Sequence, residues 1–218
     1  MPRAATEGQG SFETRGVPRQ KGENDKTAAM KEAVAGLFKP ESDRPYETIR
    51  KHPHGDYRVG RYGLSGNQLS SWIDSLSPEQ IEKLIAEGKL PKNFADPKFL
   101  EKFKATAQKM AKGEQPSESD LKQFLPKEAQ ETIAGQLMDQ FGAKVGSDPG
   151  KISAAMMSGN TPDKLTQEDL SSPGAQELAK AGQKLYDIAT SRQHVDNGSG
   201  AFRGDKVPEG SRRSLIEK

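Results

Sequence analysis

Apolar residues recur at three- and four-residue intervals through most of the chain, the spacing typical of amphipathic helices. The pattern predicts helices over 27–38, 67–76, 77–88, 96–113, 117–125, 126–146, 148–160 and 173–193. In the last of these the expected buried face carries Leu178, Ala181, Leu185 and Ile188. No segment alternates apolar and polar residues for long, so we expect little strand. The sequence predicts a mainly α fold.

Helix boundaries carry their own sequence signals. Ser-Pro at 77–78 and Asp-Pro at 96–97 are typical of helix starts, and Gly88 and Gly113 are typical of helix ends. These signals make the predicted helices separate elements with short connections.

One stretch breaks the helical pattern. Residues 40–65 read PESDRPYETIRKHPHGDYRVGRYGLS, with prolines, tyrosines and glycines close together. We expect an irregular segment over 45–66, with a short hairpin around 56–60. Binding residues are commonly presented on such segments by a rigid scaffold, so this is the predicted functional region.

Composition separates the ends of the chain from its middle. Residues 1–25 and 196–218 are rich in Gly, Pro, Arg, Glu and Ser and lack apolar periodicity, and the mean hydropathy of the chain is −0.86. Both segments are predicted to be disordered tails. A single helical domain over 27–194 is then expected.

Charge and residue usage exclude several functions. Lys and Arg number 33 against 31 Asp and Glu, a net charge of +2 that is too balanced to indicate nucleic-acid binding. With no cysteine, no disulfide or thiolate metal site is expected. No apolar run is long enough to predict a membrane span, and no standard secretion signal is recognised. His52 and His54 flank Pro53 without a nearby third ligand, so we expect a solvated turn rather than a metal site, and no cofactor is implied.

Candidate chemistry gathers in the irregular segment. Glu41 follows an apolar helix, where partial burial would raise the pKa of a carboxyl toward that of a general acid. Tyr46, Tyr57 and Tyr62 have flat apolar rings with polar tips, which suit a sugar ring. Trp72 stands among apolar helical positions and is expected in the core.

The order of residues in this segment resembles the catalytic segment of lysozyme-like lytic transglycosylases, particularly the short type that accompanies bacterial secretion systems. The matching residues are Glu41, Ser42, Pro45, Tyr46, Ile49, Pro53, Gly55, Tyr57 and Gly60. A weaker resemblance follows at Asp148-Pro149 and 154–159, where the family has a helix of the type Ala-Ala-Tyr-Asn-Ala-Gly. Residues 76–146 have no counterpart in the resemblance.

The resemblance implies a lysozyme-like fold and cleavage of peptidoglycan between N-acetylmuramic acid and N-acetylglucosamine. Glu41 would act as the single acid and base, and the 6-hydroxyl of the muramyl residue would close a 1,6-anhydro ring. Ser42 would orient Glu41. Tyr46, Tyr57 and Tyr62 would line the sugar groove, and Ser65 or Gln68 would replace a substrate-binding Gln of the family. Peptidoglycan and secretion-apparatus proteins are the implied partners, in the bacterial envelope or outside the cell.

The identity of the acid and the function both stay open. Glu47 lies 16 residues before Gly63, a separation that other transglycosylases have between their acid and a Gly-Leu pair, so it competes with Glu41. Gly63 and Met156 stand where the family has a Gln and a Tyr. Their loss of polar groups favours a second hypothesis, a catalytically inactive module that binds glycan or a protein partner. A secreted effector is the third.

Overall fold

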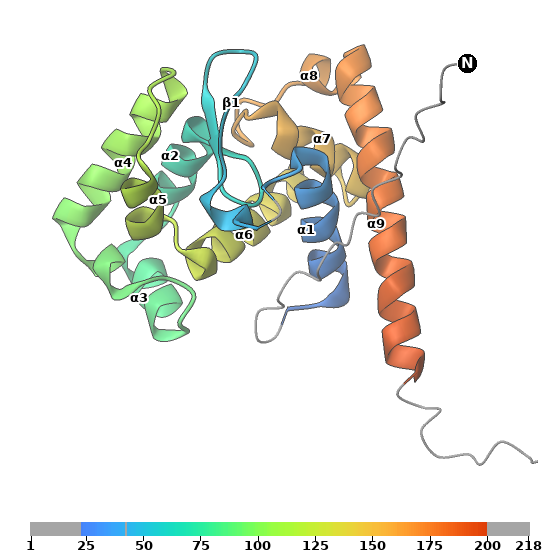
Figure 1. The fold of residues 1–218 in the computed structure, drawn as a ribbon, viewed down its shortest axis with the longest axis horizontal. Helices are drawn as coiled ribbons and strands as arrows, with labels where there is room; N and C mark the ends of the chain where they lie inside the picture. Colours follow the sequence, from blue (N-terminus) through green and yellow to red (C-terminus); the bar gives the residue numbers. More distant parts are fainter. Residues whose placement is uncertain (1–22, 42, 200–218) are drawn as a thin grey trace, which may run out of the picture.

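A computed structural model describes residues 23–41 and 43–199 of the chain. This part is mainly helical with one small sheet, as the sequence predicts (Figure 1). The elements are α1 (Asp25–Phe38), η1 (Pro45–Glu47), β1 (Ile49–Lys51), β2 (Tyr57–Val59), β3 (Leu64–Ser65), α2 (Gly66–Asp74), α3 (Pro78–Ala86), η2 (Lys92–Ala95), α4 (Pro97–Ala111), α5 (Glu118–Phe124), α6 (Lys127–Val145), α7 (Pro149–Ser158), α8 (Gln167–Ser171) and α9 (Pro173–Ser199). The tails predicted at 1–25 and 196–218 fall largely outside the described residues, although α1 begins at Asp25 and α9 continues to Ser199.

Capping residues start and end the helices where the sequence predicts. Ser77 caps α3 and Asp96 caps α4, each followed by a proline in the first turn. Gly88 and Gly113 follow these two helices with φ angles of 70° and 86°, in the left-handed region that favours glycine. Further capping boxes join Ser65 to Gln68, Ser117 to Asp120 and Thr166 to Asp169. Local sequence therefore sets most helix boundaries.

The irregular segment folds into a three-stranded antiparallel sheet in the order β1-β2-β3. Ile49 pairs with Val59, and Val59 also pairs with Leu64, so β2 is the central strand. The expected hairpin around 56–60 is thus part of a slightly larger sheet. Its third strand leads directly into α2.

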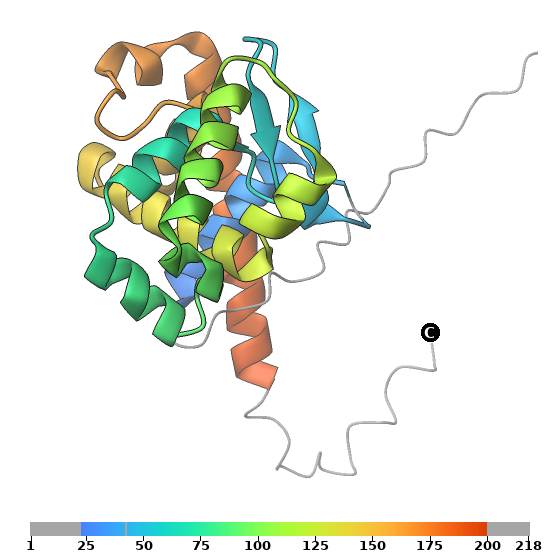
Figure 2. The same cartoon turned by 90° about the vertical axis from the view of Figure 1, so that its left-hand side faces the viewer.

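Helix α6 lies between two groups of helices. In Figures 1 and 2, α2, α3, α4 and α5 gather on one side of α6, and α1, α7 and α9 gather on the other. Ile133, Leu137 and Phe141 of α6 are fully buried. This helix is therefore the centre of the hydrophobic core.

Aromatic rings fill the core on the α2–α5 side. Trp72 is fully buried, and its ring meets Phe94 and Phe103 edge-on at centroid distances of 6.4 and 6.5 Å. Phe99 and Phe124 continue the cluster at 5.0 Å from one another. Edge-to-face pairs add to the stabilisation from buried area. The predicted core position of Trp72 is confirmed.

Small residues allow close packing on the other side. A Cβ at Gly182 of α9 would lie 2.4 Å from the Cβ of Ser153 in α7, and a Cβ at Gly150 would lie 2.5 Å from the carbonyl oxygen of Ala179. Gly36 of α1 similarly accommodates the Leu185 side chain. Helices α1, α7 and α9 approach one another because these positions lack side chains.

This packing corrects the predicted face of α9. Gly182 and Ala189 are buried and Leu178 and Leu185 half-buried, whereas Ile188 is 39% exposed. Ala181, expected on the buried face, is also exposed. The prediction gave weight to side-chain size, but the contact is made where small residues let the backbones come together. No helix in the described part of the chain has the length and apolar character needed to cross a membrane.

Two glycines of α9 provide a matched test of this packing. Gly182→Ala should lower the free energy of unfolding by about 1–3 kcal/mol, because the new methyl overlaps Ser153 in a packed core. Gly174→Ala meets no atom within 4 Å, so it should be neutral or stabilising by up to about 1 kcal/mol. Urea unfolding of both variants checks the pair, and equal effects would contradict close packing at Gly182.

Candidate functional site

Glu41 lies between the end of α1 and the sheet. The helix stops at Phe38 because Lys39 adopts a left-handed conformation, with a φ of 53°. Pro40 therefore follows the helix and does not kink it. The backbone N–H of Glu41 donates to Thr48 Oγ1 at 2.9 Å, and the side chain is 48% exposed. The backbone at Glu41 is fixed while its carboxylate faces solvent.

Arg44 lies close to several carboxylates. We call the surface formed by Glu41, Arg44, Glu47, Glu118 and Lys122 the Arg44 face. The Arg44 guanidinium lies 3.8 Å from Glu41, 3.8 Å from Glu47 and 3.9 Å from Glu118 of α5. Lys122 of α5 reaches Glu47 at 3.6 Å. The predicted acid and its competitor thus share one counter-ion. Exposed ion pairs of this length contribute little to stability, so a ligand can displace them at low cost.

Two predicted sugar-binding tyrosines point elsewhere. The hydroxyls of Tyr46 and Tyr62 both donate to Glu131 Oε1 of α6, each at 2.6 Å. Tyr62 is fully buried, and Arg61 and Lys127 both lie over the half-buried ring of Tyr46 at 5.8 Å. In this structure the two tyrosines join the sheet region to α6.

The other oxygen of Glu131 faces a lysine. Lys31 Nζ of α1 lies 3.1 Å from Glu131 Oε2 and also pairs with Glu23. The side chains of Lys31 and Glu131 are only 1% and 2% exposed. A buried charge is tolerated when it is paired and hydrogen-bonded, and Glu131 satisfies both conditions. One carboxylate therefore joins α1, η1, the residues after β2, and α6.

Gln130 reinforces this junction. Its side-chain amide donates to the carbonyl oxygens of Tyr46 and Leu125 at 2.8 and 2.6 Å, and its oxygen accepts from the N–H of Arg61 at 3.0 Å. A Cβ at Gly60 would lie 1.9 Å from the Gln130 oxygen, and Gly60 has a φ of 71°, so this position requires glycine.

Other predicted binding residues have structural contacts. Ser65 Oγ donates to the carbonyl oxygen of Gly159, and Gln68 Nε2 donates to that of Met156; Ser65 and Gln68 are both buried. They therefore attach α2 to the end of α7. The hydroxyl of Tyr57 donates to Gln115 at 3.4 Å on the surface. Ser42 lies outside the described residues.

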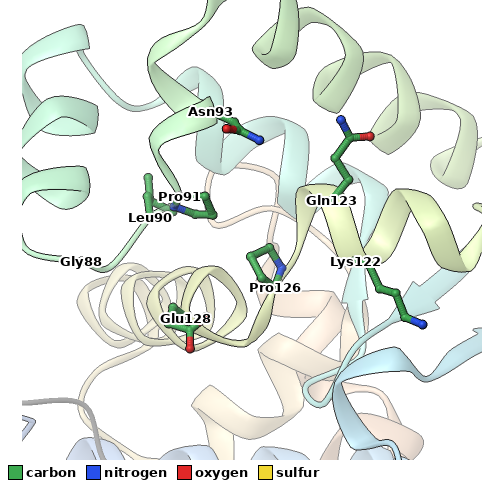
Figure 3. A pocket seen from close by; sticks show the side chains of 8 residues that line it. All are labelled: Gly88, Leu90, Pro91, Asn93, Lys122, Gln123, Pro126 and Glu128. Carbon is green, nitrogen blue, oxygen red and sulfur yellow. The ribbon is translucent and has the colours of Figure 1, made fainter.

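A cavity of about 440 Å³ lies among the residues drawn in Figure 3. Its walls are the loop before η2, the end of α5 and the start of α6. The lining residues are Gly88, Leu90, Pro91, Asn93, Lys122, Gln123, Pro126 and Glu128. Lys122 lines this cavity and also reaches Glu47 of the Arg44 face.

His52 and His54 occupy the β1–β2 turn. His52 lies 3.5 Å from Asp56, which pairs with Arg58 at 2.7 Å. Burial, followed by the charge of Arg58, lowers the pKa of His52. Within residues 23–41 and 43–199, no three His, Asp or Glu side chains are grouped to hold a metal ion.

Sequence reasoning missed Glu131, Gln130 and Lys31. A signal was present: Glu131 precedes the buried Ala134 and Met138 by three and seven residues, so it occupies the apolar face of its own helix. A charge at such a position indicates a buried partner, but the sequence does not identify that partner.

Comparison with known proteins identifies no relative of this chain. No family model, no curated protein and no solved structure matches the chain.

Loss of Lys31 tests the buried pair. Lys31→Met should lower the free energy of unfolding by about 3–5 kcal/mol, because it leaves Glu131 charged and buried without its cation. Adding Glu131→Gln should recover part of this loss. Lys26→Met, on the exposed side of the same helix, is the control and should change stability by less than about 0.5 kcal/mol. If the effects of the two substitutions on the free energy of urea unfolding simply add in the double variant, the pairing of Lys31 with Glu131 is contradicted.

Tyr62 should make the fold sensitive to alkali. Burial, then the charge and hydrogen bond of Glu131, raise the pKa of Tyr62 well above its usual value. Above about pH 10 the unfolded chain loses this proton and the folded chain keeps it, so stability falls as pH rises, by about 1.4 kcal/mol per pH unit. Urea unfolding between about pH 9 and pH 11 should show a shallower decline for Tyr62→Phe than for the wild type. Parallel declines would show that this proton is not retained on folding.

Proposed function

We propose that the protein cleaves peptidoglycan glycan strands as a lytic transglycosylase, with Glu41 as its acid and base. The observation that carries the proposal is the position of Glu41. It follows a long helix, precedes a three-stranded antiparallel sheet and exposes its carboxylate to solvent. The carboxylate is therefore accessible to a glycan strand.

One carboxyl is sufficient for this reaction. Protonated Glu41 would donate its proton to the glycosidic oxygen as the bond to the muramyl C1 breaks. The resulting carboxylate would then take the proton of the muramyl 6-hydroxyl as that oxygen bonds to C1. The substrate supplies the nucleophile, so neither Glu47 nor Glu118 has to act on the sugar.

The contacts of Arg44 support a role in controlling Glu41. In the structure Arg44 is shared between Glu41 and Glu47, at 3.8 Å from each. A sugar entering beside Glu41 would displace the guanidinium toward Glu47 and Glu118. Glu41 would then lose its cation and lie against the C–H face of the sugar ring.

The proposed reaction also indicates where the protein works. Its substrate is the bacterial cell wall, so we place the active protein in the envelope or outside the cell, with secretion-apparatus proteins as candidate partners. The cavity beyond Lys122 is large enough to hold part of a glycan strand.

A second candidate is a non-catalytic module that binds glycan or a protein partner. The observation in its favour is the burial of Tyr62, Ser65 and Gln68 in internal hydrogen bonds. An enzyme of this type needs side chains that contact the sugar, and these three are engaged within the fold.

A single substitution separates the two candidates. Glu41→Gln should reduce release of anhydromuropeptides from peptidoglycan sacculi by at least about a thousandfold, since an amide cannot transfer the proton. Glu47→Gln, on the same face and sharing Arg44, is the matched control and should keep most of the activity. Mass spectrometry of the soluble products measures both.

The outcomes are distinct. If Glu47→Gln is the inactive variant, the acid is assigned to the wrong residue. If the folded wild type releases no product but sediments with sacculi, the binding module is correct.

A further inference from the structure

A second cavity lies where α1, α6, α7 and α9 come together, on the side of α6 opposite α2 to α5 (Figures 1 and 2). It has a volume of about 360 Å³. We call it the Asp139 pocket, and none of its lining residues belongs to the Arg44 face. The lining includes Met30 of α1, Met138, Asp139 and Ala143 of α6, Ile152 of α7 and Tyr186 of α9.

Three apolar residues of this lining belong to the core. Met30, Met138 and Ile152 are 7%, 3% and 7% exposed. Met30 Sδ accepts from the hydroxyl of Ser153 at 3.8 Å, and Gly150 lets the start of α7 approach the backbone of α9. The apolar part of the pocket is therefore fixed by the packing of the four helices.

Asp139 brings a charge to this apolar surface. Its side chain is accessible to solvent, so a ligand in the pocket can reach it. Within the described part of the chain no hydrogen bond or ion pair holds its carboxylate, and partial burial raises its pKa. A carboxylate in this state is stabilised by any cation that comes to lie beside it.

The protein does not supply that cation from the described residues. Lys31 alone among their charges lowers the pKa of Asp139, and Lys31 is buried and already paired with Glu131 and Glu23. Lys26 also lines the pocket but is not among the charges that shift this pKa. The carboxylate is thus available to a ligand.

These features narrow the ligand class. Small-molecule sites are concave and mostly apolar, with a few polar groups that orient the ligand, and a carboxyl with a perturbed pKa in such a pocket is a candidate for binding. An ionised carboxylate only accepts hydrogen bonds, so it favours a donor and disfavours an anion. Within residues 23–41 and 43–199 no three acidic or histidine side chains are grouped to hold a metal ion.

We propose that the Asp139 pocket binds a small molecule that carries a primary ammonium group on an apolar body. The ammonium lies against Asp139, where its hydrogen bonds are charge-assisted, and the body covers Met30, Met138 and Ile152. The aromatic ring of Tyr186 is a further surface that is compatible with a cation. This site does not depend on glycan cleavage at Glu41.

Titration of the ¹⁵N-labelled full chain with phenethylamine, followed by amide chemical shifts at about pH 7, tests the proposal. Saturable shifts are expected in residues 26–30, 138–143 and 186. Phenethyl alcohol, which has the same body without the charge, should bind about tenfold more weakly. Phenylpropionate, which carries a carboxylate, should give no saturable shifts there.

Three variants locate the site. Asp139→Asn should lower the affinity for phenethylamine about tenfold, to that of the alcohol. Ala143→Leu, at an exposed helical position, places a larger side chain in the cavity and should weaken binding of both the amine and the alcohol. Glu101→Gln makes the same carboxylate-to-amide change at an exposed position of α4 and is the matched control, with unchanged affinity.

The proposal is overturned if phenethylamine gives no saturable shifts, if the alcohol or the anion binds as tightly as the amine, or if Asp139→Asn keeps the affinity of the wild type. Shifts confined to residues 41–47 and 118–122 would also overturn it, because the amine would then pair with carboxylates of the Arg44 face. Glu41→Gln should bind the amine as the wild type does, so this result is independent of the proposed reaction.

Discussion

A buried carboxylate, Glu131, is the contact on which the rest of the structure depends. It accepts hydrogen bonds from Tyr46 and Tyr62 on one oxygen and faces Lys31 on the other. Burying this charge costs free energy that only a complete set of partners offsets. Those partners come from three separate parts of the chain, so the carboxylate stabilises the arrangement that brings all of them together and disfavours arrangements that omit one.

The Arg44 face combines a backbone fixed by internal hydrogen bonds with side chains joined only by long, exposed ion pairs. Gln130 and Glu131 hold η1 through the carbonyl oxygen and the hydroxyl of Tyr46, and Thr48 holds the backbone of Glu41. In front, the carboxylates share Arg44 through long, exposed contacts. A site of this construction keeps its backbone in place while its charges rearrange around a ligand. That combination supports the proposed acid–base role, because the proton donor has to be positioned before its counter-ion leaves.

The fold was more predictable from the sequence than the site. Capping pairs such as Ser77-Pro78 act within one turn, so they identify helix starts without knowledge of the rest of the chain. The face of α9 was predicted less well, because Gly182 packs by its lack of a side chain and no hydropathy pattern records that. The prediction that Tyr62 meets a sugar comes from its residue type and from the resemblance. Its hydrogen bond to Glu131, 69 residues away in sequence, is a property of the tertiary fold and could not be inferred locally.

The central claim, that Glu131 holds the sheet region onto the helices, is tested most directly by amide hydrogen exchange of a Tyr46→Phe/Tyr62→Phe variant against the wild type. Without the two hydroxyls, amides of residues 46–62 should exchange faster by at least about tenfold, while those of α7 and the first turns of α9 keep their protection. Equal acceleration throughout the chain, or none in residues 46–62, would contradict the claim and reduce Glu131 to one core contact among many.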